Sequence, residues 1–409
     1  MKNDIGDRLA LIWGAALLVA ACSATPTTVP PASPSGPNAA PSSAATGWFA
    51  ARVEQPVTIE GQPTDAPAFC SPCHPIVGTY IDALVAFRGG YLALGSDHPP
   101  SHAAAWTSAD AVSWKRLATL PAPEGSSIAA AVARSDAGIL AVGTDGRAAA
   151  VWASADGVTW TMESLRAPAG VGAAEHLTAV AHASGGYVAA GYVESADAAR
   201  SATFWLSPDG VAWSPAPATL PSGASEVTGL AAAPGGDLVV AVGISGDERR
   251  GTAAVWRSTD GGASWQAVSN PSLAGGRMLA VAAGERGFAA VGENTDQTGA
   301  AAWTSADGSV WSPAPVQPSL ANGGLQMVMA AVAADGPGFV SSGWKTDAGN
   351  GSAVVWRSSD GSTWARYPQD SSFSGAGMAA VLATPRLLAA GTMGWPDTHA
   401  AEVWIAPLH

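Results

Sequence analysis

Charged residues are scarce in this sequence, and lysine is almost absent. Only 12% of the 409 residues are charged, and 19 basic against 32 acidic side chains give a formal net charge of −13. Lysine occurs only as Lys2, Lys115 and Lys345. Binding to a phosphate backbone depends on clustered Lys and Arg side chains. The composition therefore predicts no nucleic-acid partner.

A long hydrophobic run is also missing. The most apolar stretch, residues 9–19, is shorter than the roughly 20 residues that span a bilayer. Lys2 and Arg8 precede it, and the small residues Ala20 and Ala21 follow it. A basic start, a short apolar core and small residues are typical of a signal peptide, here residues 1–22. We therefore expect an exported protein.

The end of that run, Leu18-Val19-Ala20-Ala21-Cys22, resembles the lipobox of bacterial lipoproteins. The resemblance implies that Cys22 is acylated (for example with palmitate), becomes the first mature residue and anchors the protein to the cell membrane. The domain would then face outside the cytoplasm, with the lipid as its membrane contact. Ordinary signal-peptide cleavage beside an incidental cysteine is the alternative.

Residues 23–46 consist almost entirely of Pro, Ser, Thr, Ala and Gly. Such a segment buries too little apolar surface to offset its ordering entropy, so it predicts a disordered tether. The remaining residues, 47–409, form the predicted folded domain.

Repetition dominates the folded domain. A motif of the form W-x-S-x-D-G-x-x-W recurs, and its Asp residues are Asp110, Asp156, Asp209, Asp260, Asp307 and Asp360. A seventh first Trp, Trp404, lacks the second half of the motif. A Gly that ends a short apolar run keeps the same rhythm, at Gly95, Gly143, Gly191, Gly243, Gly292, Gly343 and Gly391. Seven repeats with this spacing, each of which can be divided into four strands, predict an all-β, seven-bladed β-propeller.

The repeat motif resembles the Asp-box (BNR) repeat of the sialidase-like propeller superfamily. The segment from Ser258 to Trp265 matches S/T-x-D-x-G-x-T/S-W in full, and the other five copies are one residue shorter. The resemblance implies that the Asp residues are structural and lie on outer turns, away from the ligand face. The last repeat lacks an outer strand. The segment Gly47-Trp48-Phe49-Ala50, at the start of the predicted domain, resembles the outer strands of the other repeats. We expect this N-terminal strand to close the last blade.

In propellers, ligands bind on the face that carries the loops between the second and third strands. Polar or unpatterned aromatic residues near that face are candidates for ligand binding: Asp82, Glu175, His176, Glu226, Arg277, Trp344 and Trp395. No catalytic residue and no metal site is assigned. The leading hypothesis is a non-enzymatic scaffold that binds a protein or glycan ligand.

The first alternative is a glycan-active hydrolase of the sialidase-like type. The Arg-Ile-Pro motif of sialidases is absent, and no Tyr–Glu pair can be assigned. Two carboxylates could still act together, with Asp82 beside Glu175 or Glu226 as the pair to examine.

The second alternative concerns Cys70-Ser71-Pro72-Cys73-His74. C-x-x-C-H is the attachment motif of c-type haem, with His74 as an axial ligand. About thirty residues separate Trp48 from Ile81, too few for a cytochrome domain. In an exported protein the pair Cys70 and Cys73 more simply forms a disulfide, and no cofactor is then needed.

Overall fold

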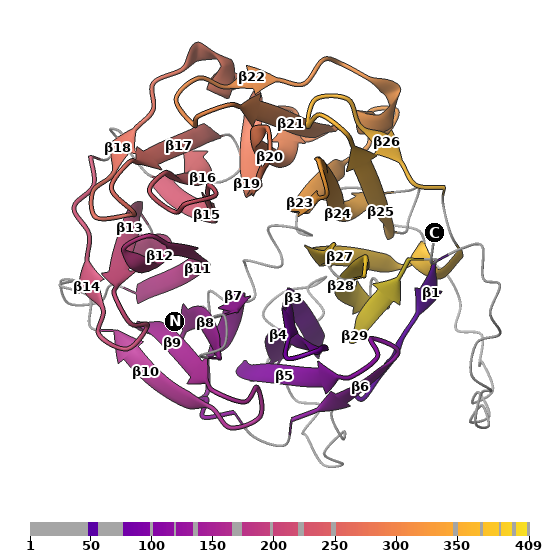
Figure 1. Ribbon diagram of the computed structural model, residues 1–409. Helices are drawn as coiled ribbons and strands as arrows, with labels where there is room; N and C mark the ends of the chain where they lie inside the picture. Colours follow the sequence, from indigo (N-terminus) through magenta and orange to yellow (C-terminus); the bar gives the residue numbers. More distant parts are fainter. Residues whose placement is uncertain are drawn as a thin grey trace.

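The chain folds as an all-β, seven-bladed propeller, as predicted. The computed structural model describes residues 48–55, 77–98, 101–117, 120–133, 138–165, 174–196, 199–219, 225–246, 251–346, 351–368, 371–383, 386–394 and 398–406. Figure 1 shows the sheets standing radially around a common centre, with chain order running round the ring. No helix in these ranges is long and apolar enough to cross a membrane.

Each blade has four antiparallel strands that run from the centre outward. The innermost strands are β3 (Val77–Phe87), β7 (Ser127–Ala133), β11 (Ala174–Ala183), β15 (Ser225–Ala232), β19 (Gly276–Gly284), β23 (Met327–Asp335) and β27 (Ala376–Leu382). The second strands are β4 (Gly90–His98), β8 (Ile139–Thr144), β12 (Gly186–Glu194), β16 (Val239–Ser245), β20 (Gly287–Asn294), β24 (Gly338–Thr346) and β28 (Leu388–Met393). Blades one to seven follow this order.

The third and outer strands complete the blades. The third strands are β5 (His102–Ser108), β9 (Ala149–Ser154), β13 (Arg200–Ser207), β17 (Thr252–Ser258), β21 (Ala300–Ser305), β25 (Gly351–Ser358) and β29 (Thr398–Ile405). The outer strands are β6 (Ser113–Arg116), β10 (Thr161–Leu165), β14 (Ser214–Pro215), β18 (Gln266–Ala267), β22 (Ser312–Pro313), β26 (Ala365–Arg366) and, in blade seven, β1 (Phe49–Ala50). Three 3-10 turns, η3 (Pro271–Gly275), η4 (Pro318–Leu320) and η5 (Ser371–Phe373), precede blades five, six and seven.

The tryptophans of the repeat are packed between blades. The third-strand Trp of each repeat is at most 3% exposed. Trp152 of blade two, for example, packs with Leu92 and Leu94 of blade one. Its indole N–H donates to Pro121 O at 2.9 Å, in the linker from blade one. A large ring with one polar atom thus fills the gap between two sheets and also fixes the chain that joins them.

The repeated Gly of the second strand faces a β-bulge in the innermost strand. The register shifts at this point in every blade, for example between Val227 and Gly229 of β15. A Cβ atom on Gly243 would lie 1.9 Å from Glu226 O, and the equivalent glycines show gaps of 1.8–2.0 Å. Only a residue without a side chain allows the bulge carbonyl to approach so closely. This contact explains why a Gly recurs at the end of the apolar run in each repeat.

An N-terminal strap, residues 48–55, joins blade seven to blade one. Within it, β1 pairs antiparallel with β29, and Ala50 lies opposite Trp404, so the predicted ring closure is confirmed. The next strand, β2 (Arg52–Val53), adds in parallel to β6 of blade one. Gln55 Nε2 then donates back to Ala401 O of blade seven at 2.9 Å. The strap therefore holds both sides of the seam (Figure 1).

The bulge contact predicts the effect of one added methyl group. We expect Gly243→Ala to lower the free energy of unfolding by about 3 kcal/mol, because the backbone of two strands must separate. Gly275→Ala is the matched control, since nothing lies within 4 Å of a Cβ there. Urea unfolding of both variants is the measurement. Equal stabilities of the two variants would show that the bulge contact is not required.

Candidate functional site

The propeller has two different faces. We call the end with the linkers between blades and the connections between second and third strands the loop face. The opposite end, the turn face, carries the remaining hairpin turns. Gly261 N, in the last hairpin of blade four, donates to Asp237 O, in the first hairpin of that blade, at 2.9 Å. Both sets of turns therefore lie side by side on the turn face.

Four of the predicted ligand-face residues, His176, Glu226, Arg277 and Trp344, belong to equivalent residue pairs in their blades. In each blade, this pair joins the innermost and second strands next to the bulge, on the side towards the loop face. We call these pairs the mouth pairs. In blade order they are Tyr80–Ser96, Ser127–Thr144, His176–Tyr192, Glu226–Ile244, Arg277–Glu293, Val328–Trp344 and Gly377–Thr392. Imidazole, carboxyl and guanidinium side chains occur in the mouth pairs of blades three, four and five. The other four blades have uncharged residues there, with the phenol of Tyr80 in blade one.

Arg200 links the mouth pairs of blades three and four. Its Nε lies 3.1 Å from Glu194 Oε2, and its Nη1 lies 2.8 Å from Glu226 Oε2 on the next blade. The guanidinium also lies over the ring of Tyr192, 4.6 Å from its centroid. The other neighbour of that ring is His176, stacked at 5.0 Å. The side chains of Arg200, Glu194 and Glu226 keep 12–16% of their surface exposed, so the cluster reaches the loop face.

Blade five contains a second ion pair, between Arg277 and Glu293. Their side chains are only 6% and 3% exposed. Burying two charges is favourable only when each is well paired. This pair therefore stabilises the blade more than it offers charge to solvent.

Glu175 lies one residue before the mouth pair of blade three and is buried against blade two. Its Oε1 accepts hydrogen bonds from Trp205 Nε1 at 2.8 Å and from Thr203 Oγ1 at 3.0 Å. Burial raises the pKa of the Glu175 carboxyl, and these two donors oppose the rise. In blade two, the indole N–H of Trp152 donates to the backbone carbonyl of Pro121 in the linker. In blade three, the Glu175 carboxyl takes the place of that carbonyl as the acceptor for Trp205.

The remaining predicted residues have different surroundings. Asp82 is the half-buried residue at the bulge of blade one. Burial, and then the charge of Asp82, raise the pKa of Tyr80. Trp344 is 1% exposed and packs with Val328 and Leu279. Trp395, Cys22, Cys70, Cys73 and His74 lie outside the described residues.

The six repeat aspartates stabilise their own turns. In blade three, Asp209 Oδ1 accepts the backbone N–H groups of Val211 and Ala212 at 2.8 and 2.9 Å, and the Ser207 hydroxyl at 3.1 Å. The pKa of Asp209 is lowered because the Ala212 and Val211 N–H groups stabilise its charged form. Asp110, Asp156 and Asp307 have lowered pKa values through hydrogen bonds within their own turns. These carboxylates have a structural role.

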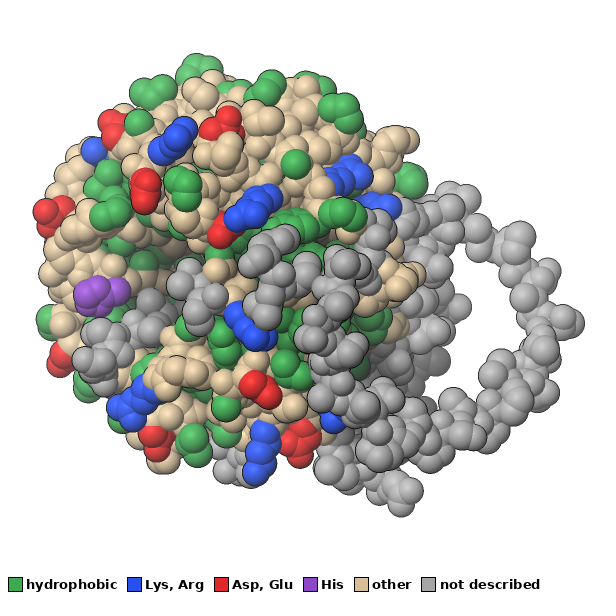
Figure 2. Space-filling view, turned by 45° about the vertical axis from the view of Figure 1, so that its right-hand side comes forward, with side chains coloured by type: hydrophobic (Ala, Val, Ile, Leu, Met, Phe, Trp, Pro, Cys, Tyr) green, Lys and Arg blue, Asp and Glu red, His purple; other side chains and the backbone are tan. Residues whose placement is uncertain are grey.

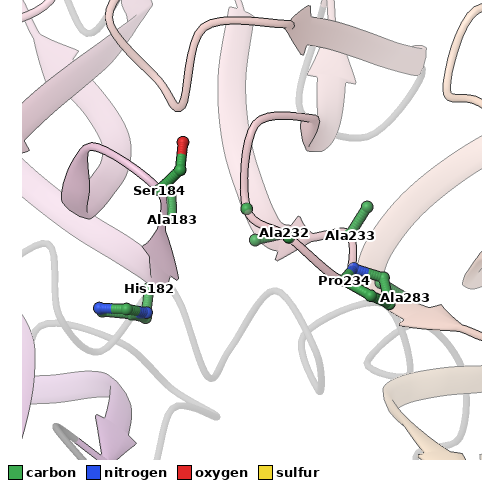
Figure 3. A pocket seen from close by; sticks show the side chains of 9 residues that line it. His182, Ala183, Ser184, Ala232, Ala233, Pro234 and Ala283 are labelled. Carbon is green, nitrogen blue, oxygen red and sulfur yellow. The ribbon is translucent and has the colours of Figure 1, made fainter.

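A shallow hollow of about 360 Å³ opens on the turn face. Hairpin residues of blades three, four and five line it, as Figure 3 shows, with His182 and Ser184 on one side and Pro234 and Ala283 on the other. Most of its lining is Ala, Gly and Pro, with the His182 imidazole as the titratable group. The hollow lies at the opposite end from the charged mouth pairs.

The sequence did not point to Glu402. It is two residues before the third-strand Trp of blade seven, where the other repeats have Ala104, Ala150, Thr203, Ala254, Ala301 and Val354. Burial raises the pKa of Glu402 to about 7. An alignment of the repeats on the third-strand Trp would have revealed this carboxyl, because no other repeat has a charge there.

Charged side chains of both signs lie on the face of the propeller that Figure 2 draws. Figure 2 shows acidic and basic side chains intermixed on one face, with no gathering of basic groups. Within the described ranges, no group of three or more His, Cys, Asp or Glu side chains could hold a metal ion.

Known proteins similar to this chain were found among solved structures alone. No family model and no curated protein matches this sequence. Among solved structures, YCF48 bound to a D1 peptide is 11% identical with a TM-score of 0.48, over 89% of this chain and 96% of that one. U3-55K is 12% identical with a TM-score of 0.49, over 82% and 96%. An α-L-arabinofuranosidase from Fusarium graminearum is 13% identical with a TM-score of 0.45, over 72% and 92%. At these identities and TM-scores the similarity carries no statement about what this chain binds or does.

The surroundings of Glu175 predict two different effects of substitution. Glu175→Leu leaves the Trp205 and Thr203 donors without an acceptor, and we expect a loss of about 1–3 kcal/mol for each donor. Glu175→Gln keeps an acceptor oxygen and should cost much less at neutral pH.

The pH dependence of stability has a definite sign. The folded-state pKa of Glu175 is raised, so the folded state binds more protons than the unfolded state above the ordinary value of 4.5. Stability should therefore fall in the wild type as pH rises from 4.5 towards the raised value, with a shallower fall in Glu175→Gln. Urea unfolding of the wild type and of Glu175→Gln across this pH range is the measurement. The prediction would be contradicted if the free energy of unfolding had the same pH dependence in both proteins.

Proposed function

We propose that this protein is an exported lipoprotein whose propeller binds a protein or peptide ligand on the loop face, above blades three and four. The partly exposed cluster of Arg200, Glu194 and Glu226 beside the mouth pairs of these two blades is the observation that supports this proposal. Four blades keep the fold with uncharged mouth pairs, and desolvating charges is unfavourable unless other interactions offset it. This charged cluster is therefore better explained by recognition than by folding.

The cluster around Arg200 has the composition of a recognition surface. It combines an aromatic ring, a guanidinium and two carboxylates at the edge of solvent, held by hydrogen bonds across two blades. Arg and Tyr side chains are enriched where proteins bind one another. The surface is also rigid, because its groups extend from paired strands rather than from free loops.

The hydrolase alternative requires carboxylates that are free to act on a glycan. Glu175 and Glu226 were its candidates beside Asp82. Glu175 is 2% exposed and accepts two hydrogen bonds from its own blade, and Glu226 is paired with Arg200. These contacts favour the scaffold proposal. The lipid anchor at Cys22 and the assignment of the turns to the Asp-box type belong to the same proposal.

Peptide selection on the full-length protein tests the binding site. We expect peptides selected by phage display to lose at least about tenfold in affinity with Glu226→Gln or Arg200→Ala, because truncating one partner of a desolvated charge pair costs about 2–5 kcal/mol. Glu163→Gln, an exposed residue on outer strand β10, makes the same charge change and should bind normally.

The outcomes of this experiment separate the alternatives. Unchanged affinity in Glu226→Gln and Arg200→Ala would place the site elsewhere. Binding on a glycan array, with turnover of aryl glycosides, would replace the scaffold by the hydrolase.

Intact mass and an absorption spectrum of the protein from membranes test the cysteines. We expect a lipid mass on Cys22, loss of membrane association in Cys22→Ser, and a colourless protein two mass units lighter than its reduced form, since Cys70 and Cys73 are joined. A Soret band with an added haem mass would instead make His74 an axial ligand. An unmodified Cys22 would remove the lipoprotein assignment.

A further inference from the structure

The cluster around Arg200 contains two carboxylates that are only partly used. Glu194 and Glu226 each bind Arg200 through one oxygen, Oε2, at 3.1 and 2.8 Å. Among the described residues, the other oxygen of each carboxylate, Oε1, has no hydrogen-bond donor. Neither Oε1 atom is one of the buried polar atoms that lack a partner, so both are open to solvent. Two acceptor oxygens of this cluster are therefore available to a ligand.

The other groups of the cluster are already engaged. The Arg200 guanidinium lies between the two carboxylates and over the Tyr192 ring, 4.6 Å from its centroid. His176, which is 4% exposed, stacks with the same ring at 5.0 Å. The ring is itself only 1% exposed, so it offers no face on which an aromatic group of a ligand could stack. Ionised carboxylates accept hydrogen bonds and donate none, so the ligand must supply the donors.

The charges at this end of blades three and four are not balanced. The acidic residues on the described strands of the two blades are Glu175, Glu194 and Glu226, and the Lys or Arg residues are Arg200 and Arg257. Arg257 belongs to the turn face, where its Nε donates to Asp307 O at 2.8 Å. One guanidinium thus lies between two partly exposed carboxylates, with an excess of one negative charge. Because an unpaired charge is costly where water is partly excluded, a further cation is favoured there.

The arginines of the neighbouring blades do not supply this cation. Arg277 of blade five is paired with Glu293, and their side chains are 6% and 3% exposed. Arg147 of blade two lies beside Glu175, whose backbone N–H donates to Arg147 O at 3.0 Å. Glu175 is buried against blade two, so this contact belongs to the preceding interface between blades. Within the described part of the chain, neither arginine forms an ion pair with the two carboxylates that hold Arg200.

On the basis of the proposed function of the loop face, we propose that its ligand is a basic peptide segment, with one Lys or Arg side chain that donates hydrogen bonds to Glu194 and Glu226 beside Arg200. The ligand cation brings the cluster to two cations and two carboxylates, so that each charge has a counter-charge. Arg200 holds the two carboxylates in place, and the ligand binds the acceptor oxygens that Arg200 leaves open. The net charge of −13 also attracts a basic partner at longer range, in a salt-dependent way.

Peptides selected by phage display on the full-length protein provide the test. We expect these peptides to contain a Lys or Arg whose replacement by Gln weakens binding at least about tenfold in calorimetric titration. The same replacement should weaken binding less than about threefold in a protein with both Glu194→Gln and Glu226→Gln, because the carboxylates that it contacts are gone. Glu163→Gln, an exposed residue on outer strand β10, is the matched control and should retain the full effect.

A reciprocal exchange of charge guards against variants that fail to fold. Glu194→Lys should reject the basic peptide, because it places two like charges together. The same variant should bind the peptide in which the essential Lys or Arg is replaced by Glu. Such a gain of binding cannot arise from loss of the fold.

The outcomes separate the basic ligand from the proposed function itself. Peptides that lose affinity in Glu226→Gln and Arg200→Ala but contain no essential basic residue would overturn the basic ligand alone, and the loop-face site would stand. A basic residue with equal effect in the wild type and in the double variant would also overturn it, because the peptide would then respond to net charge rather than to contact. Unchanged affinity in all of these variants, or a selection without any binder, would overturn both proposals.

Discussion

The packing of one tryptophan against the preceding blade is the interaction on which this propeller depends. Each blade is a narrow sheet that cannot bury both its faces alone, and stacking neighbours into a ring provides the missing contacts. The third-strand indole fills the wedge-shaped gap between two sheets, and small Ala and Gly residues let the sheets approach. A sequence with 17 Trp but only 7 Phe and 5 Tyr reflects this geometry.

The outer edges of the blades show how the chain protects exposed backbone groups. In blade one β2 covers the edge, and in blade four Thr219 N donates to Trp265 O at 2.9 Å. In blade six the side chain of Gln317 replaces a strand: it donates to Ser362 O and accepts from Trp364 N, both at 2.9 Å. The linkers between blades therefore also pair with the outer strands, which explains why several outer strands can be only two residues long.

Much of this architecture could be predicted from the sequence, because a repeat displays its own alignment. The spacing of the tryptophans gave the number of blades, and the orphan segment at Trp48 gave the closure. The functional face was harder to predict. His176, Glu226 and Arg277 were chosen for their polarity, and they do share one position of the repeat. Their partners are set by register between strands and by contacts across blades. Arg200 therefore bridges Glu194 and Glu226 in a way that no spacing in the sequence reveals.

The same reasoning explains why Glu175 and Glu402 differ although both are carboxyls beneath a third-strand Trp. Glu175 extends from the innermost strand and meets two donors on β13, so hydrogen bonds to one of its oxygens offset part of the cost of its burial. Glu402 extends from the third strand itself, and in that blade the indole of Trp404 donates to Ser372 O instead, at 3.1 Å. One repeat thus uses a buried carboxyl as an acceptor for donors on its own third strand, while the half-buried Glu402 has no such donors, because Trp404 donates to the linker instead. The difference arises because register and the chain between blades, rather than the repeat motif, decide which acceptor each indole meets.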